Sequence, residues 1–297
     1  MNAAAAQYPI SQFKSFQAWQ THITQWVRAA TNQKAQLLLF PEYGSLELIS
    51  LFSPTIQACI HQQIEALNDL KDDFCDVFAQ LAKRFGVVIV APSLPFTVSD
   101  EVFNRSFVFS AKGLVGYQDK FFMTRFEDES WQIKSAPKIL TVFEADWGRF
   151  GIQICYDAEF ALGSALLAQH GAEMILVPSC TETAQGAARV HTGARARALE
   201  NQAYVLVSQT VGKAIWSPVV DINYGYAAAY STPDKGFPVM GVLKYKRAQK
   251  IGWLVVDLDF LLIQSVRAEG NVLNWKSHQA LKLGFEQESI QIIQNMV

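Results

Sequence analysis

The sequence has few cysteines, and their spacing excludes a fold that depends on disulfides. Only four of the 297 residues are cysteine, and no two of them form a C-x-x-C pair. Small secreted domains held by disulfides carry cysteine far more densely. The five histidines include no H-x-x-x-H pair, so their spacing gives no sign of a zinc site. We therefore predict a reduced, cytoplasmic protein.

Long apolar runs and an excess of one charge are also missing. No segment approaches the roughly 20 apolar residues that a membrane helix needs, and residues 1–10 lack the basic start and apolar run of a signal peptide. Lysine and arginine number 25 against 27 aspartates and glutamates, a formal charge of −2. Such a balance gives no bulk attraction to nucleic acid or to an anionic membrane. We expect neither as a partner, and we expect the basic run 244–250 on a solvated hairpin.

Three loop signatures that would announce other chemistries are absent. The chain contains no G-x-x-x-x-G-K-[ST], no G-x-G-x-x-G after a strand and no G-x-S-x-G. These motifs cradle phosphates, bind dinucleotides and carry the nucleophile of serine hydrolases, respectively. The sequence therefore gives no support to any of these three classes.

What is present is a large apolar fraction arranged in alternating short runs and helical stretches. Hydrophobic residues make up 50% of the chain and charged residues 18%, enough for a large core. Apolar periodicity predicts helices over 16–30, 67–85, 163–170 and 187–202. It predicts strands over 3–6, 36–40, 87–90, 103–109, 114–117, 139–143, 150–155, 174–177, 204–209, 227–230 and 253–257. With no linker between them, these elements indicate one domain of layered sheets with helices outside.

A cysteine stands at the end of one predicted strand. Cys155 closes the apolar run 150–155 and is followed at once by Tyr156 and Asp157. A thiol in this place would point out of the sheet, and the next backbone N–H could face a bound oxyanion. The alternative is a buried, inert cysteine, which is the common fate of a free thiol.

Two charged residues follow other predicted strands. Glu42 comes directly after the apolar run 37–41, where an acid is costly unless it is hydrogen-bonded or used as a base. Its alternative is a solvated or helix-start acid. Lys120 precedes three apolar residues and could stabilise a thiolate or an oxyanion. Its alternative is a surface lysine paired with Asp119.

Taken together, these residues resemble the nitrilase superfamily, the carbon–nitrogen hydrolases with a Glu–Lys–Cys triad. Glu42, Lys120 and Cys155 occur in that order, 78 and 35 residues apart. The segments 171–179 and 195–201 resemble the strand and the helix that follow the nucleophile in this family. The resemblance extends from about residue 3 to residue 257.

The resemblance implies an α/β fold, a four-layer α-β-β-α sandwich built from a single domain over residues 1–297. It implies a homodimer or higher homo-oligomer, with the segment 258–297 as a tail that packs on a partner subunit. It also implies hydrolysis of a non-peptide carbon–nitrogen bond without metal or organic cofactor. In this scheme Cys155 is the nucleophile, Glu42 the base and Lys120 the cation that offsets negative charge.

Many members of the family carry a second glutamate shortly after the lysine. Glu127 and Glu129 are the candidates, seven and nine residues beyond Lys120. Either could instead belong to a solvated acidic loop, and the sequence leaves the choice between them open.

Two residues next to the cysteine bear on the substrate. Tyr156 would offer its backbone N–H to the oxyanion, and a tyrosine here favours an amidase over a true nitrilase, which often has tryptophan. Glu159 stands where relatives that act on carboxylate-bearing amides have a basic residue. It therefore favours a neutral or amine-bearing substrate, unless it is a structural hydrogen-bond acceptor.

The function that this resemblance predicts is hydrolysis of a small aliphatic amide or N-carbamoyl compound through a thioester. The alternatives are a true nitrilase, a catalytically silent scaffold that binds a partner, and acyl transfer through the same thioester. Retention of the triad argues against the silent scaffold, and the relatives that acylate lipids carry membrane helices. A metalloenzyme would need ligands at irregular spacing, namely Cys155, Asp157, Glu159 and His191.

Overall fold

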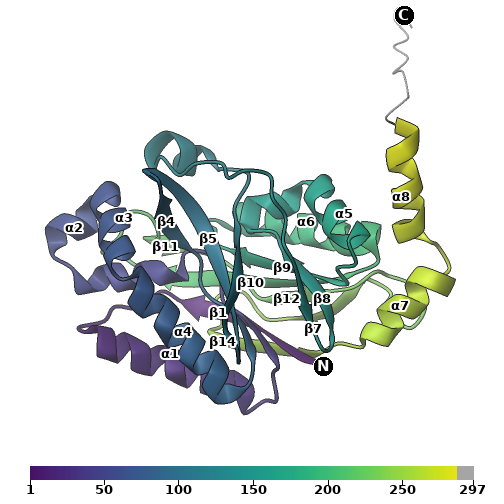
Figure 1. The fold of residues 1–297 in the computed structure, drawn as a ribbon, viewed down its shortest axis with the longest axis horizontal. Coiled ribbons are helices and arrows are strands. Elements are labelled where there is room, and N and C mark those ends of the chain that lie inside the picture. Colours follow the sequence, from purple (N-terminus) through teal and green to yellow (C-terminus); the bar gives the residue numbers. More distant parts are fainter. Residues whose placement is uncertain (286–297) are drawn as a thin grey trace, which may run out of the picture.

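Fourteen strands form one strongly curled sheet in the computed structural model, which describes residues 1–285 (Figure 1). The main path of neighbouring strands runs β4-β5-β3-β2-β1-β10-β9-β8-β7, and β6, β11, β12, β13 and β14 join it at its sides. The strands are β1 (Asn2–Pro9), β2 (Leu37–Leu39), β3 (Val88–Val90), β4 (Leu94–Val98), β5 (Glu101–Ser110), β6 (Gly113–Asp119), β7 (Val142–Ala145), β8 (Gly148–Ile152), β9 (Met174–Ser179), β10 (Tyr204–Lys213), β11 (Ile222–Asn223), β12 (Ala228–Tyr230), β13 (Val242–Tyr245) and β14 (Gly252–Asp257).

Helices cover both outer faces of this sheet. They are α1 (Phe16–Thr31), α2 (Pro54–Ala58), α3 (Ile60–Asp69), α4 (Lys71–Phe85), α5 (Ala161–Gln169), α6 (Ala184–Asn201), α7 (Phe260–Glu269) and α8 (Asn274–Phe285). Short tight turns of helix occur at η1 (Gly44–Leu51), η2 (Phe126–Ser130) and η3 (Cys155–Glu159). Figure 1 shows α1 and α4 side by side on one face and α5 and α6 on the other. The predicted four-layer α-β-β-α sandwich is thereby confirmed.

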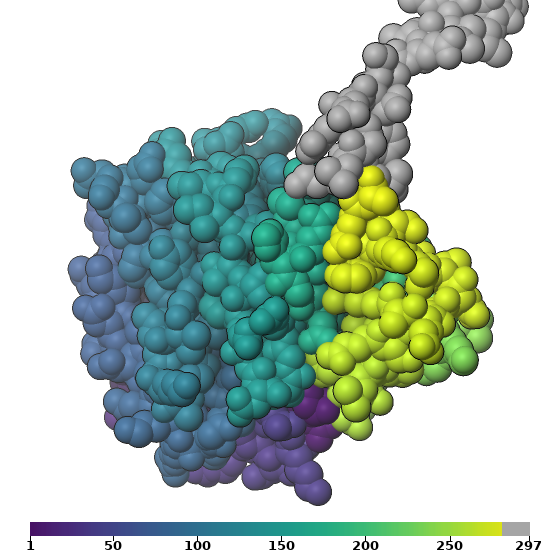
Figure 2. Space-filling view, turned by 45° about the vertical axis from the view of Figure 1, so that its right-hand side comes forward, coloured from purple at the N-terminus to yellow at the C-terminus, as the bar shows by residue number. Residues whose placement is uncertain are grey.

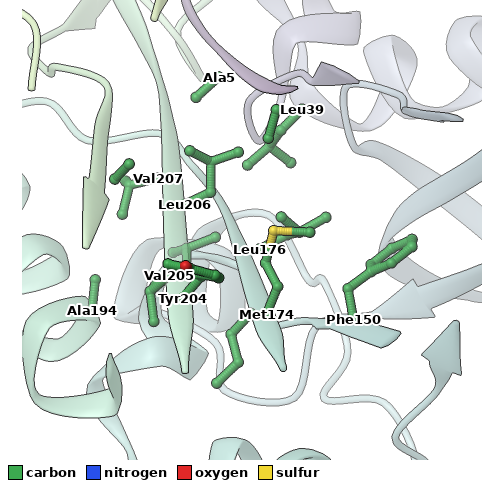
Figure 3. Packing of buried hydrophobic residues seen from close by; sticks show 14 of the residues in the cluster. Ala5, Leu39, Phe150, Met174, Leu176, Ala194, Tyr204, Val205, Leu206 and Val207 are labelled. Atoms are coloured by element: carbon green, nitrogen blue, oxygen red, sulfur yellow. The ribbon is translucent and has the colours of Figure 1, made fainter. Parts of the chain in front are cut away.

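The central strand β1 shows why the layers stack. Side chains alternate across a strand, and this strand sends Ala3 and Ala5 into one apolar cluster and Ala4, Ala6 and Tyr8 into another. The first cluster fills the space between the two halves of the sheet, where Ala5 and Leu39 face strands β9 and β10 (Figure 3). The second lies beneath α1 and α4. A strand buried on both faces reads as a continuous apolar run, as this one does.

The helical periodicity that the sequence predicts is present in α1 and α4. Trp19, Ile23 and Val27 form the buried stripe of α1, whose first turn is capped by the Ser15 side chain accepting from Ala18 N–H. The predicted helix over 67–85 is wrong in one respect, because it is two helices, α3 and α4, that meet at Leu70. Sequence reasoning missed α3 since its buried face includes a glutamine as well as apolar residues.

The C-terminal helices rest on the chain's own surface (Figure 2). Arg267 of α7 donates hydrogen bonds to the carbonyls of Ala172, Asn201 and Gln202, and Trp275 donates from its indole to Ala168. The predicted tail 258–297 therefore packs on its own subunit through residue 275. Residues 286–297 lie outside the described residues, and contact with a partner subunit stays a prediction. No helix within residues 1–285 has the length and apolar character to span a membrane.

An unusual acid lies beneath α1. Glu47 of η1 is fully buried, and its Oε1 accepts hydrogen bonds from the Tyr8 hydroxyl at 2.6 Å and the Trp19 indole at 2.8 Å. Burial raises the pKa of Glu47 to about 8, although these hydrogen bonds act to lower it. The side chain therefore folds as a neutral acid near pH 7.

We expect Glu47 to make the stability fall as the pH rises. Because the folded pKa exceeds the unfolded one of about 4.3, its contribution is complete below pH ~4 and is lost as the pH rises through about 8. That loss is on the order of 3–5 kcal/mol. Glu47→Gln keeps the Oε1 acceptor without the titration, so its urea midpoint should exceed the wild-type midpoint at pH 8.5 and approach it at pH 5. Parallel pH slopes in the two proteins would contradict this.

Candidate active site

The three loops predicted to carry chemistry meet at one edge of the sheet. Strands β2, β8 and β10 run parallel through β1 and β9. Strand β6 has the same direction as β2 and β3, because two antiparallel pairings through β5 restore it. Glu42 follows β2, Lys120 follows β6 and Cys155 follows β8. The carboxyl ends of parallel strands share an edge, so the topology brings these three residues together.

Lys120 is the centre of the charged group. Its Nζ lies 2.8 Å from Glu42 Oε1 and 2.6 Å from Glu127 Oε2, and its side chain is almost completely buried. Burial lowers the pKa of Lys120, but the charges of Glu127 and Glu42 raise it well above its usual value. The lysine is therefore a permanent ammonium, which excludes the surface lysine that the sequence allowed.

Glu42 is held by donors from three directions. Lys120 and the Asn104 amide donate to Oε1, each at 2.8 Å, and the Cys180 backbone N–H donates to Oε2 at 2.9 Å. Burial raises the pKa of Glu42, Lys120 opposes this, and the charge of Glu127 raises it further. A carboxylate with a raised pKa accepts a proton more readily, as a general base requires.

Of the two candidates for a second glutamate, the structure brings Glu127 to the lysine and leaves Glu129 outside. Glu127 accepts from Lys120, from the Tyr43 hydroxyl at 2.7 Å and from the Thr124 backbone and hydroxyl, both at 2.9 Å. Burial raises its pKa, but Lys120 and the other donors leave it below the usual value. Glu129 is exposed and pairs with Arg125 at 2.9 Å.

The two buried glutamates therefore differ in their readiness to take a proton. One lysine serves both, yet Glu127 stays ionised while the pKa of Glu42 is raised. Opposite shifts in neighbouring acids are how a site separates a fixed charge from a proton carrier. The geometry gives Glu42 the proton-transfer position and Glu127 the position of a fixed counter-ion to Lys120.

Cys155 stands on a strained turn between β8 and η3. Its φ is +50°, a left-handed conformation that is uncommon for a residue other than glycine. The predicted strand over 150–155 is too long, since β8 ends at Ile152 and the chain leaves the sheet before the cysteine. Helix α6 holds this turn closely, because a Cβ on Gly193 would lie 2.7 Å from the Ala158 carbonyl oxygen. Strain of this kind recurs at functional sites.

The Cys155 thiol is buried and sits between polar groups. Its Sγ lies 3.1 Å from the Ser179 hydroxyl, which donates to it, and 3.6 Å from the Cys180 carbonyl oxygen. Burial and the charge of Glu42 raise the pKa of the thiol well above its usual value, while Lys120 lowers it. A protonated thiol in this place needs a base to become a nucleophile.

Asp157, two residues beyond the cysteine, fastens the lysine loop to the cysteine turn. Its carboxylate accepts from the backbone N–H of Phe121 at 3.1 Å and of Phe122 at 2.8 Å. Burial raises the pKa of Asp157 to about 7, against the effect of Lys120. This contact fixes the distance between the loops that carry Lys120 and Cys155.

The residues predicted to contact substrate flank this turn. Tyr156 is half-buried and packs edge-on against Phe160 at 5.0 Å, and Phe160 lies 4.2 Å from Phe122. Glu159 pairs with Arg189 of α6 at 3.3 Å. The sequence predicts an acid that repels carboxylates here, but the arginine offsets that charge.

The metal-ligand alternative fails on geometry. Asp157 accepts backbone N–H groups, Glu159 pairs with Arg189, and His191 contacts Tyr230 and Gln209. Within the described part of the chain, no three such side chains come close enough together to hold a metal ion.

Sequence reasoning missed several members of the site. Asn104, Tyr43 and Ser179 each contact one of the charged or sulfur groups, and all three are buried. The only signal for Asn104 was a polar residue within the apolar run 103–109. Tyr43 and Ser179 gave no signal, because their roles depend on which strand ends are neighbours.

Together these groups place a nucleophile, a proton carrier and a buried cation around one point. A thiol that can lose its proton to a carboxylate and form a covalent adduct beside an ammonium is suited to acyl transfer. The arrangement contains no group that would transfer hydride or bind a phosphate through a glycine-rich loop.

Comparison with known proteins agrees with this arrangement. Residues 2–235 match the family described as carbon-nitrogen hydrolase. A Bacillus subtilis (strain 168) protein described as a probable hydrolase, YhcX, is 28% identical over 92% of this chain and 52% of its own length. The chloroplastic omega-amidase of Arabidopsis thaliana is 25% identical over 83% of this chain and 65% of its own length. The chain thus spans about half to two thirds of these relatives.

Solved structures share the fold. Nit3 of Saccharomyces cerevisiae, a member of branch 10 of the nitrilase superfamily, has a TM-score of 0.70 and 22% identity, covering 90% of this chain and 93% of that chain. A carbon-nitrogen hydrolase from Helicobacter pylori has a TM-score of 0.71 and 18% identity, covering 90% and 92%. With a family match over most of its length and this fold, the chain belongs to the carbon–nitrogen hydrolases of the nitrilase superfamily.

Proposed function

We propose that the chain hydrolyses small non-peptide amides or N-carbamoyl compounds through a thioester on Cys155. The observation that carries this proposal is the buried Lys120, ion-paired with Glu42 and Glu127 at the foot of the cysteine turn. Burying three charges is costly unless each is paired. A site that keeps them beside a strained thiol is best explained by chemistry there.

The first half of the reaction forms the thioester. Glu42 takes the thiol proton, and the Cys155 sulfur attacks the carbonyl carbon. The negative charge that develops on oxygen is stabilised by the Lys120 ammonium and by the backbone N–H of Tyr156. The carbon–nitrogen bond then breaks, and Glu42 returns its proton to the leaving nitrogen, which departs as ammonia or an amine.

The second half regenerates the thiol. Water attacks the thioester carbon and gives its proton to Glu42, and the carbon–sulfur bond breaks. The proton returns to sulfur, and the carboxylic or carbamic acid leaves. Glu127 keeps its charge throughout because Lys120, Tyr43 and Thr124 stabilise its ionised form.

The substrate side chain meets an aromatic and nearly neutral surface. Phe122, Tyr156 and Phe160 pack on one another beside the cysteine turn. The Glu159–Arg189 pair removes most of the charge preference that Glu159 alone would impose. We therefore favour a neutral amide, although several relatives are named omega-amidases, and a deaminated glutathione amidase of Yersinia enterocolitica is 34% identical over 45% of this chain.

Two other functions remain as alternatives to test. A true nitrilase would use the same sulfur on a nitrile carbon, and a silent scaffold would use none of the triad. A solved amidase of Nesterenkonia sp. AN1, 20% identical with a TM-score of 0.67, carries acrylamide on its active-site cysteine. That protein shows that this fold can hold an accessible reactive thiol.

Ammonia release from a panel of compounds tests the proposal. The panel contains a neutral aliphatic amide, an N-carbamoyl amine, succinamate and the matching nitrile. We expect kcat/KM for the best amide or carbamoyl compound to exceed that for the nitrile at least ~10-fold, about 1.4 kcal/mol in transition-state stabilisation. Turnover of the nitrile alone would establish the nitrilase instead. An intact protein that turns over none of the four would favour the scaffold.

A further inference from the structure

We propose that Ser179 is a positioning residue for Cys155, and that a chain of buried side chains reaching back to His191 directs its hydroxyl proton at the sulfur. This inference rests on the proposed function, because it assigns the sulfur a negatively charged state to be stabilised. The chain runs from β9 through β10 to α6, on the side of Cys155 opposite the glutamates' strand β2.

The contact at the sulfur is short and dry. Ser179 is fully buried, and its Oγ lies 3.1 Å from Cys155 Sγ. The same Oγ lies 3.2 Å from Gln209 Nε2. A serine hydroxyl has one proton to give and lone pairs to receive with. If the glutamine amide donates to it, the hydroxyl is free to give its proton to sulfur.

The orientation of the Gln209 amide is fixed by the backbone. Its Oε1 lies 2.9 Å from the backbone nitrogen of Tyr226, which is always a donor. The oxygen of the amide must therefore face Tyr226, and the nitrogen must face Ser179. An amide whose two ends look alike is assigned in this way from its partners.

His191 confirms the same direction from the other end. Its Nε2 lies 3.0 Å from Gln209 Oε1 and 3.1 Å from the Tyr226 carbonyl oxygen, and both of these are acceptors. Nε2 must therefore carry the proton. Nδ1 is then bare and accepts from the Tyr230 hydroxyl at 2.8 Å. Burial lowers the pKa of His191 to about 4, so the ring is neutral as this pattern requires.

Every donor in the chain therefore points toward the sulfur. Tyr230 donates to His191, His191 donates to Gln209, Gln209 donates to Ser179, and Ser179 donates to Cys155. Hydrogen bonds in series strengthen one another in a dry interior. When Glu42 removes the thiol proton, the last donor is already in place and needs no reorientation.

The other groups that face the sulfur do not duplicate this contact. Glu42 and Lys120 act on it by charge, and the Cys180 carbonyl at 3.6 Å is an acceptor. Ser179 is the side-chain donor that the described residues place within hydrogen-bond distance of the sulfur. Loss of a hydrogen bond to a charged group costs roughly 10- to 100-fold in the equilibrium that forms the charge.

Alkylation of Cys155 by iodoacetamide tests this independently of any substrate. The second-order rate is measured from pH 6 to 10, with the labelled residue identified by mass spectrometry. We expect Ser179→Ala to shift the pH midpoint of alkylation upward by about one unit, and to lower the rate at pH 7 about 10-fold. We expect Gln209→Glu to shift it in the same direction, because its carboxylate attracts the serine proton away from sulfur.

The buried Ser208 supplies the matched control. It lies on the neighbouring strand β10 and donates to the Ala6 carbonyl at 2.7 Å, away from the site. Ser208→Ala should leave the alkylation profile unchanged. Unshifted profiles in Ser179→Ala and Gln209→Glu would overturn the proposal, as would an equal shift in Ser208→Ala. If wild-type protein alkylates normally but hydrolyses nothing, the proposed function fails while the Ser179 result still stands on its own.

Discussion

Cys155→Ala is expected to abolish turnover of every substrate that the wild type hydrolyses. The sulfur is the atom that bonds to the substrate carbon, and no other side chain in the site can replace it. We expect a loss of at least ~10⁴-fold in kcat, the scale at which removal of a covalent nucleophile leaves only binding and oxyanion stabilisation. The measurement is ammonia release with the best substrate of the panel.

The remaining cysteines provide the controls. Cys75 is partly buried on α4, where burial raises its pKa to about 11, and Cys59 lies between α2 and α3. Cys59→Ala and Cys75→Ala should keep full activity, and iodoacetamide should label Cys155 in both. Wild-type activity in a correctly folded Cys155→Ala protein would remove the cysteine from the mechanism.

Glu42→Gln is the second substitution with a large expected effect. The glutamine can still accept from Lys120 and Asn104, so the site should keep its shape while losing the group that carries protons. General-base catalysis contributes about 10² to 10⁴ in rate. We expect kcat to fall by that factor with little change in KM, measured with the same substrate.

Two further glutamates separate charge from proton transfer. Glu127→Gln removes a buried counter-ion of Lys120, so both its activity and its melting temperature should fall. Glu129→Gln changes an exposed acid two residues away and should alter neither. A Glu42→Gln protein as active as Glu129→Gln would refute the base assignment.

The sequence allowed the fold to be predicted further than the site. Alternating or continuous apolar runs predicted β1, β2 and β9, because strands buried on both faces have a distinctive composition. The helices missed were those whose buried faces include polar residues, as α3 does with Gln63. The charged residues Glu42 and Lys120 were visible because acids and lysines are conspicuous next to buried strands.

The neutral partners were not visible, for a physical reason. Asn104, Tyr43 and Ser179 act through distances to residues 24 to 84 positions away in sequence. Periodicity reports which face of an element is apolar, but it does not report which strand ends adjoin. Only the strand order, with β8 beside β9 and β2 on the far side of β1, reveals that Ser179 and Glu42 approach the same sulfur.

The central place of β1 has a consequence for how the chain acquires its structure. This strand pairs with β2 nearby, with β10 about two hundred residues later and with β14, where Asn2 lies opposite Asp257. During synthesis the first strand is therefore made long before two of its three partners exist. Contacts so distant in sequence form slowly, since the loop between them must close first. The alanine-rich strand must wait with its apolar faces exposed, and β1 is the segment most in need of protection from aggregation until residue 257 has been made.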